Sequence, residues 1–405
     1  MVKIVFLHPD LGIGGAERLV VDAGLAFKQK GHDVHFITSH HDPSHCFSET
    51  RDGTLPVTVV GDWLPRSVFG HFYALCAYAR MIYAAIYLVF ISNLSPDVIF
   101  CDQISACIPV LKFGHANILF YCHFPDQLLS IPGGWLKKLY RAPINWLEQT
   151  TTGQADVVFV NSQFTSQIFR DTFPRLKHVN TKVLYPSLNT DNFDKNLNTN
   201  LNDIIGRNLP DDAFVFLSIN RYERKKNLGL ALQALRELRG LLTDMEWFKV
   251  YLVMAGGYDS RVAENREHYE ELSLLVQSLK LGDKVCLLKS PSDDAKLALL
   301  KACSCLVYTP ANEHFGIVPL EAMYVGRPVI AVNSGGPTET VVHEVTGLLC
   351  PPSAPSFGAA MAQCFRGDAK KMQGACRERI KKHFSFQAFA QQLDSCISHV
   401  REKQS

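Results

Sequence analysis

Residues 3–38, KIVFLHPDLGIGGAERLVVDAGLAFKQKGHDVHFIT, decide the fold class of this chain. Residues 3–7 are mostly apolar and predict a strand, which is followed by a glycine-rich turn at 12–15. Residues 17–30 have the apolar spacing of a helix, and Gly31 stands where a helix typically ends. Asp33–Thr38 then predicts a second strand. Strand, helix and strand in this order indicate the α/β class, with a parallel sheet covered by helices.

The same alternation continues along the chain and then restarts. Further strands are expected at 97–101, 117–122 and 156–161, and their unbroken apolar runs indicate a sheet covered on both faces. Residues 186–212 are polar and rich in asparagine, which predicts a linker or a domain edge. A second series of strands follows at 213–219, 250–255, 285–288, 305–308 and 329–332.

We therefore expect two tandem Rossmann-like, doubly wound parallel-sheet domains. The first spans 1–185 and the second 186–384, and residues 385–405 supply a last helix expected to pack back on the first domain. Ligands of such domains bind at the carboxyl ends of the strands, so a cleft between the two domains is the expected site.

Composition narrows the class of protein further. A length of 405 residues suffices for two large domains, and 47% hydrophobic with 20% charged residues excludes a disordered chain. The 41 basic and 39 acidic residues nearly balance, so nothing demands a nucleic acid as partner. The twelve cysteines form no C-x-x-C pair, which favours reduced thiols. The apolar run at the first residues is too short for a secretory signal, and a cytosolic location is expected.

The strongest chemical signal is the stretch EHFGIVPLE, from Glu313 to Glu321, which follows a predicted strand and opens a helix. Gly316 permits close backbone approach, and the helix N-terminus offers N–H groups and a positive dipole to an anion. A carboxylate can accept hydrogen bonds from two adjacent hydroxyls of a sugar ring or a ribose. The stretch therefore indicates a nucleotide-sugar site.

Cations follow the first strand of the second domain in NRYERKKN, which contains Arg221 and Lys226. Fixed cations at a strand end can stabilise the charge that grows on a diphosphate leaving group. Gly257, at the end of the strand 250–255, is expected to bind substrate as well. In the first domain, Gly14 and Gly15 would bring backbone N–H groups to the diphosphate.

One histidine of the first domain also follows a predicted strand. His123, in YCHFPD, could hydrogen-bond a sugar hydroxyl or the reacting centre, although a lone histidine can equally be structural.

Together these motifs resemble the retaining, GT-B-fold glycosyltransferases of the glycogen-synthase and sucrose-synthase group. The motifs are GGAE from Gly14, Arg221 with Lys226, Glu313 with Glu321, and GGPTE from Gly335. With HPDLG, YCHFPD and LYRAPI, the chain looks like a eukaryotic GDP-mannose-dependent α-1,3/1,6-mannosyltransferase of lipid-linked oligosaccharide assembly.

This resemblance implies residue roles. Arg221 and Lys226 would bind the donor diphosphate, Glu313 the mannosyl hydroxyls, and Glu321 the ribose. The stretch Phe315, Gly316, Ile317 and Val318 would supply backbone contacts. One departure is Asn227, where the wider family usually has glycine, so the local turn needs another explanation.

The resemblance also implies substrates and partners. The donor would be GDP-mannose, with no cofactor and no metal ion at its diphosphate. The acceptor would be a dolichyl-diphosphate oligosaccharide at the cytosolic face of the endoplasmic reticulum membrane. Other mannosyltransferases of the pathway would be further partners. A glycosyltransferase using another nucleotide-sugar on a soluble acceptor, and an inactive membrane scaffold, are the alternatives.

Two segments favour contact with a membrane. The segment 72–91, from Phe72 to Ile91, is apolar and long enough to span a bilayer, but Arg80 near its middle disfavours spanning. An interfacial helix and a helix buried on the sheet both remain open. The segment 135–148, from Trp135 to Glu148, predicts an amphipathic helix with Lys137, Lys138 and Arg141 off its apolar face, or an ordinary surface helix.

Overall fold

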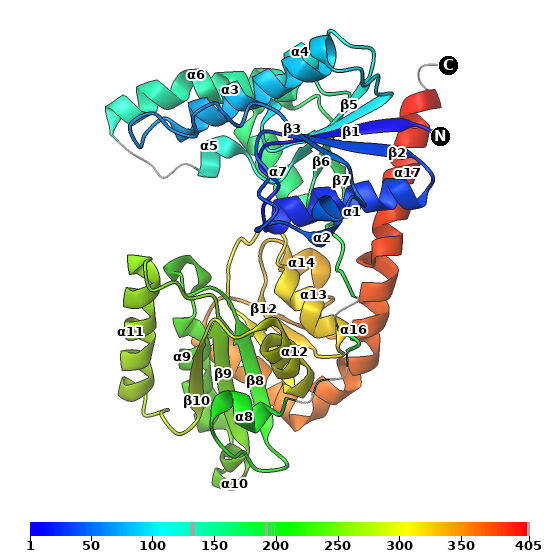
Figure 1. Ribbon diagram of the computed structural model, residues 1–405. Coiled ribbons are helices and arrows are strands. Elements are labelled where there is room, and N and C mark those ends of the chain that lie inside the picture. The colour runs from blue at the N-terminus through cyan, green and yellow to red at the C-terminus, as the bar shows by residue number, and fades with distance from the viewer. Residues whose placement is uncertain (130–133, 191–192, 196, 198, 403–405) are drawn as a thin grey trace. The chain divides into compact units, whose positions relative to one another are not determined.

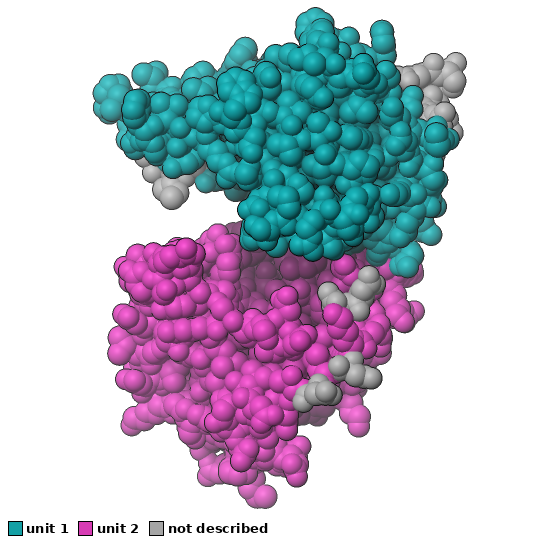
Figure 2. Space-filling view, in the orientation of Figure 1, with its two compact units in different colours: residues 1–187, 386–405 teal, residues 188–385 magenta. Residues whose placement is uncertain are grey.

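The computed structural model describes residues 1–129, 134–190, 193–195, 197 and 199–402 and divides into two compact units (Figures 1 and 2). Unit 1 comprises residues 1–187 and 386–405, and unit 2 comprises residues 188–385. Each unit has its own parallel sheet.

Unit 1 is built on a sheet of seven described strands in the order β3-β2-β1-β4-β5-β6-β7, and all of their pairings are parallel. The strands are β1 (Lys3–His8), β2 (Asp33–Thr38), β3 (Val57–Val59), β4 (Val98–Asp102), β5 (Asn117–Cys122), β6 (Val157–Val160) and β7 (Lys182–Val183). The helices are α1 (Gly15–Gln29), α2 (Ser48–Arg51), α3 (Tyr73–Ile86), α4 (Ile108–Leu111), α5 (Asp126–Leu129), α6 (Trp135–Thr152), α7 (Gln163–Thr172) and α17 (Phe386–Glu402).

Alternate residues of each strand face opposite sides of this sheet. Val5 and Leu7 of β1 belong to an apolar cluster with α3, α4 and α6, whereas Ile4 and Phe6 belong to a second cluster with α1 and α17. The last helix, α17, lies beside α1 (Figure 1). It completes the core of unit 1 through side chains such as Leu393, which is fully buried.

Unit 2 has a sheet of six described strands in the order β10-β9-β8-β11-β12-β13, again with parallel pairings throughout. The strands are β8 (Phe214–Ile219), β9 (Val250–Gly256), β10 (Val285–Lys289), β11 (Cys305–Tyr308), β12 (Val329–Val332) and β13 (Gly347–Cys350). The helices are α8 (Leu201–Ile205), α9 (Gly229–Leu241), α10 (Asp244–Phe248), α11 (Ala263–Ser278), α12 (Asp293–Ala302), α13 (Ile317–Tyr324), α14 (Pro337–Thr340), α15 (Ala354–Gln363) and α16 (Ala369–His383).

The predicted fold class is confirmed, since both units are Rossmann-like parallel sheets with helices on their faces. The strands that the sequence did not predict, β3, β7 and β13, all lie at sheet edges. β3 and β7 are only three and two residues long, too short for a pattern of apolar residues to stand out.

The segment 72–91 forms α3 followed by a π-helical turn at Tyr87–Ile91. By length and composition it could cross a membrane, yet one side of it is packed on the sheet through Met81 and Leu88. Arg80 is buried, and its guanidinium donates to the carbonyl of Ser39 at 2.6 Å and to Asp62 at 2.9 Å. Protein groups therefore neutralise the one charge of this helix.

Candidate functional site

A cavity of about 440 Å³ opens in unit 2 where strands β8, β9 and β11 end. Seven residues predicted from the sequence line it: Arg221, Lys226, Gly257, Glu313, Gly316, Ile317 and Val318. They come from three separate segments, which follow β8, β9 and β11, and the parallel topology brings these segments to one edge of the sheet.

Lys226 and Glu313 form the central ion pair of the cavity. The Lys226 ammonium donates to Glu313 Oε2 at 2.5 Å, and both side chains are largely buried. The turn that carries Lys226 is fixed because Thr309 donates its hydroxyl to the Lys226 carbonyl at 2.8 Å. Asn227 ends this turn in the left-handed conformation, with φ of 49°. Asparagine tolerates that conformation better than most residues, so it can replace the glycine that the wider family usually has there.

Arg221 follows Asn220, the first residue after β8, and its side chain is more exposed than that of Lys226. Its side chain is 62% exposed and bonds Glu223 at 2.9 Å, so its guanidinium remains accessible to an anion. The neighbouring glycines let β8 and β9 approach each other: a Cβ on Gly256 would lie 1.6 Å from the Asn220 carbonyl oxygen, and one on Gly257 would lie 3.2 Å from Arg221 Cγ. Close backbone approach explains the glycine pair.

The loop that presents Glu313 is clamped by the two glycines that follow β12. Gly336 donates its N–H to the Glu313 carbonyl at 2.7 Å. A Cβ on Gly336 would lie 2.2 Å from the Phe315 carbonyl oxygen, and Gly335 has a φ of +67°. The GGPTE motif is therefore a structural support for the acidic loop rather than part of the cavity lining.

Tyr308 and His314 complete the polar surroundings of Glu313. Burial and the nearby Glu313 carboxylate raise the pKa of Tyr308 well above its usual value, so the phenol keeps its proton and can donate it. Burial lowers the pKa of His314, and Lys226 and Lys225 add to this against the opposing charge of Glu313. His314 is therefore neutral at pH 7.

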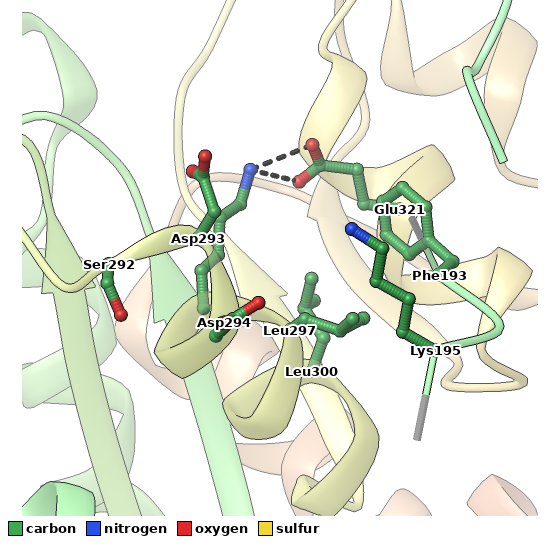
Figure 3. Close-up of a pocket in the computed structure, with 9 residues that line it drawn as sticks. Phe193, Lys195, Ser292, Asp293, Asp294, Leu297, Leu300 and Glu321 are labelled. Carbon is green, nitrogen blue, oxygen red and sulfur yellow. Dashed lines mark hydrogen bonds and ion pairs between the residues drawn. The ribbon is translucent and has the colours of Figure 1, made fainter. Parts of the chain in front are cut away.

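Glu321 lies in the second turn of α13 and is held by Lys296 of α12. The Lys296 ammonium contacts both carboxylate oxygens, at 2.8 and 2.7 Å (Figure 3). Lys296 lines the first cavity and also a neighbouring one of about 520 Å³, which Glu321 shares with Phe193, Asp293 and Asp294. Phe315 differs from the other predicted residues, because its side chain is buried and does not line either cavity.

Sequence reasoning missed Lys296, Tyr308 and Ser290 among the residues that line the first cavity. A signal existed for Lys296. A cation near the start of a helix opposes the helix dipole, and its presence in the first turns of α12 indicates a carboxylate partner. Nothing in the sequence identifies Glu321, 25 residues further along the chain, as the partner of Lys296.

The remaining predicted residues lie in unit 1. Gly14 precedes α1 and Gly15 is its first residue, while His123 directly follows β5. His123 Nε2 lies 2.8 Å from Asp102 Oδ2. Within the described residues, no group of three or more His, Cys, Asp or Glu side chains is arranged to hold a metal ion.

The unit 2 site pairs cations with carboxylates in a cavity of polar side chains and helix N–H groups. Such a cavity can bind a phosphate-bearing ligand that also carries hydroxyls. With two Rossmann-like units, this site fits the class of GT-B glycosyltransferases that the sequence motifs resemble.

Comparisons with known proteins agree. The family model "Glycosyl transferases group 1" matches residues 200–383, and "Glycosyltransferase Family 4" matches residues 13–192. The human protein named alpha-1,3/1,6-mannosyltransferase ALG2 is 53% identical over 96% of this chain and 94% of its own length. The ALG2 protein of Schizosaccharomyces pombe is 40% identical over 98% of this chain and 80% of its own length. The chain belongs to the ALG2 family of mannosyltransferases.

Solved structures share the fold at low identity. Sucrose-phosphate synthase from Thermosynechococcus elongatus aligns over 100% of both chains with a TM-score of 0.73 and 21% identity. A glycosyltransferase from Rickettsia africae aligns over 98% of both chains, with a TM-score of 0.72 and 18% identity.

Proposed function

We propose that this protein is a retaining mannosyltransferase. It moves mannose from GDP-mannose to a dolichyl-diphosphate-linked oligosaccharide, forming first an α-1,3 and then an α-1,6 linkage in the precursor of protein N-glycosylation. Relatives at 40–53% identity are named alpha-1,3/1,6-mannosyltransferases, which supports the linkages. The observation that carries the proposal is the Lys226–Glu313 pair beside Arg221 in one cavity.

The donor diphosphate binds to Arg221 and Lys226. Arg221 has an accessible guanidinium, which can grip phosphate oxygens with two parallel hydrogen bonds. Lys226 is held by Glu313 and offers a compact positive charge. These fixed cations stabilise the charge that develops on the leaving diphosphate, and no metal ion is required for that role.

The sugar and the ribose bind to the two carboxylates. Glu313 accepts hydrogen bonds from mannosyl hydroxyls while it stays paired with Lys226, and Glu321 accepts from the ribose. Backbone groups of Gly316, Ile317 and Val318 at the start of α13 approach the ligand between them. Lys296, already bonded to Glu321, orients that carboxylate.

Transfer proceeds on one face of the mannose ring. The bond between C1 and the diphosphate oxygen breaks, and the acceptor hydroxyl oxygen forms its new bond to C1 on the face just vacated. The acceptor proton passes to an oxygen of the departing diphosphate. We propose that His123 of unit 1 hydrogen-bonds a hydroxyl of the sugar substrates.

A lipid-bound acceptor requires the protein to reach a membrane, and unit 1 has a surface suited to this. We define its apolar strip as the exposed side chains Phe72, Tyr73 and Leu75 at the start of α3 and Trp135, Leu136 and Leu139 of α6. The two helices touch here, because the rings of Phe72 and Tyr140 lie 5.3 Å apart. Aromatic and leucine side chains of this kind favour the interfacial region of a bilayer.

Basic residues beside the strip add to this membrane preference. Lys137 and Lys138 are exposed, as the predicted amphipathic helix requires. Arg141 lies off the strip as well, but it is buried and bonds Asp126 at 2.9 Å, so it adds no exposed charge. We place the protein at the cytosolic face of the endoplasmic reticulum membrane, next to other mannosyltransferases of its pathway.

One assay tests this function. The protein is incubated with GDP-mannose and a lipid-diphosphate chitobiose that carries one mannose, and the products are sized by mass. We expect a gain of one and then two hexoses, and roughly a 10- to 100-fold slower transfer for Arg221→Ala and Lys226→Ala.

The matched control is Arg224→Ala, from the same loop. Arg224 bonds Glu267 and Glu271 on α11 and does not line the cavity, so its loss should leave transfer unchanged. Normal rates for both site variants would contradict the proposal. Transfer from another nucleotide-sugar, or to soluble sugars only, would favour the alternative glycosyltransferase.

A further inference from the structure

Three residues at the carboxyl ends of adjacent strands in unit 1 form one line of hydrogen bonds. His8 ends β1, Asp102 ends β4, and His123 follows β5. His8 Nδ1 lies 2.7 Å from Asp102 Oδ1, and His123 Nε2 lies 2.8 Å from Asp102 Oδ2. The parallel pairing of β1 with β4 and of β4 with β5 sets this order.

Burial and mutual pairing determine the charges of His8 and Asp102. His8 and Asp102 are buried, and a buried carboxylate is stable only when it is paired and hydrogen-bonded. Burial lowers the pKa of His8, but the charge and hydrogen bond of Asp102 outweigh it and raise the pKa to about 10. His8 and His123 likewise lower the pKa of Asp102 against the opposing effect of burial. The core of the line is an imidazolium–carboxylate pair.

Glu17 extends the line on the other side of His8. Its carboxylate Oε1 lies 3.8 Å from His8 Nε2, the ring nitrogen that has no closer hydrogen-bond partner among the described residues. Glu17 lies in the first turn of α1, next to Gly14 and Gly15. Both nitrogens of His8 therefore face carboxylates, which favours its protonated form.

The donors and acceptors available then set the tautomer of His123 when its ring is neutral. An ionised carboxylate can only accept, so Asp102 requires the proton of neutral His123 to be on Nε2. The other ring nitrogen, Nδ1, is left with a lone pair that accepts. The ring is held in place, since it packs on Tyr121 at 4.6 Å between centroids and Asn161 donates to the His123 carbonyl at 3.1 Å.

The side chains of His8, Asp102 and His123 differ in their exposure to solvent. The side chain of His123 is 22% exposed, whereas those of His8 and Asp102 are 0% and 1% exposed. Only the outermost histidine can therefore touch a ligand, and the two buried residues act on a ligand through it.

We propose that Asp102 and His8 are positioning residues that lock His123 in the Nε2–H tautomer, so that Nδ1 accepts a hydrogen bond from a sugar hydroxyl. The inference rests on the proposed function, in which His123 contacts the mannosyl donor or the acceptor. A purely structural ion pair would hold the strand ends together without fixing the tautomer.

Nuclear magnetic resonance of the full-length protein with ¹⁵N-labelled histidine tests the tautomer directly. His123 is one of 15 histidines, and its signals are assigned by their loss in His123→Gln. We expect a protonated Nε2 and an unprotonated Nδ1 when the His123 ring is neutral. An Nδ1–H tautomer in the unaltered protein would overturn the proposal, and this measurement does not depend on any variant that might unfold.

Kinetics test the consequence. Asp102→Asn keeps the shape of the side chain but supplies an amide that can donate, so the tautomer is no longer fixed. We expect kcat to fall by about 10- to 100-fold with a much smaller change in KM for GDP-mannose. The control Asp97→Asn makes the same substitution before the other end of β4, where Asp97 accepts from the Lys3 backbone N–H at 2.8 Å.

The outcomes separate the two proposals. Equal kcat for Asp102→Asn and Asp97→Asn, with the tautomer of His123 unchanged, would overturn the role of Asp102. Absence of mannosyl transfer by the unaltered protein would contradict the proposed function, and the tautomer measurement would still test the locking of His123.

Discussion

The ion pair between Lys226 and Glu313 determines what single-residue changes in the donor cavity should do. With Glu313 ionised, the Lys226 ammonium is shared between a carboxylate and any bound phosphate. Glu313→Gln removes the competing charge and keeps a hydrogen-bonding side chain. Lys226 is then free to pair fully with the diphosphate, while the sugar hydroxyls lose their charged acceptor.

We therefore expect Glu313→Gln to bind GDP at least as tightly as the unaltered protein does, by calorimetry. Mannosyl transfer should fall by roughly 10- to 100-fold, because a hydrogen bond to a charged group contributes about 1.5–3 kcal/mol. Parallel loss of GDP binding and transfer would show that Glu313 supports the diphosphate site and not the sugar.

At the scale of elements, the loop after β12 supports the loop after β11. A Cβ on Gly336 would lie 2.2 Å from the Phe315 carbonyl oxygen and 2.4 Å from Phe315 Cα, so Gly336→Ala must displace one of the two loops. We expect a loss of about 1–3 kcal/mol in the free energy of unfolding, together with weaker transfer because Glu313 moves. Thermal unfolding and the transfer assay measure both.

Gly240→Ala is the control for that substitution. Gly240 lies within α9, where a Cβ meets no atom within 4 Å, and alanine at an open helix position should add about 0.5–1 kcal/mol. Equal melting temperatures for Gly336→Ala and the unaltered protein would contradict the claim that the loop after β12 supports the loop after β11.

Central elements could be predicted from the sequence because burial on both faces leaves a continuous apolar run. The predicted strand at 305–308 coincides with β11, and that at 117–122 with β5. Edge strands such as β3 could not be predicted, since three half-exposed residues, Val57–Val59, carry no such signal.

The residues of the candidate site that belong to a local sequence motif could be predicted from the sequence. Arg221, Lys226 and Glu313 each follow a strand, and a parallel sheet places such residues at one edge. Partnerships set by tertiary packing could not be predicted. The contact of Lys296 with Glu321, and that of His8 with Asp102, join residues 25 and 94 positions apart.

At the scale of the whole molecule, the apolar strip on unit 1 predicts binding to lipid vesicles. Leu139 is 68% exposed, so Leu139→Glu should leave stability unchanged but weaken binding to anionic vesicles. Burial of a leucine side chain contributes about 1.5–3 kcal/mol, which is roughly a 10- to 100-fold change in the partition constant. Co-sedimentation with vesicles measures it.

The control for the vesicle experiment is Phe248→Glu. Phe248 is 62% exposed at the end of α10 in unit 2 and lies outside the strip. Equal vesicle binding by Leu139→Glu, Phe248→Glu and the unaltered protein would contradict the assignment of the strip as the membrane-facing surface.

The path of the chain has a consequence for biosynthesis. The last helix of unit 1, α17, covers the α1 face of the first sheet. Because α17 follows residues 188–385 in the chain, it is translated only after the whole of unit 2. During translation of unit 2, the apolar side chains of α1 that pack against Phe389 and Leu393 therefore stay uncovered. A premature stop codon late in the message would therefore damage the half of the enzyme that was translated first, and chaperones would meet an unfinished N-terminal sheet.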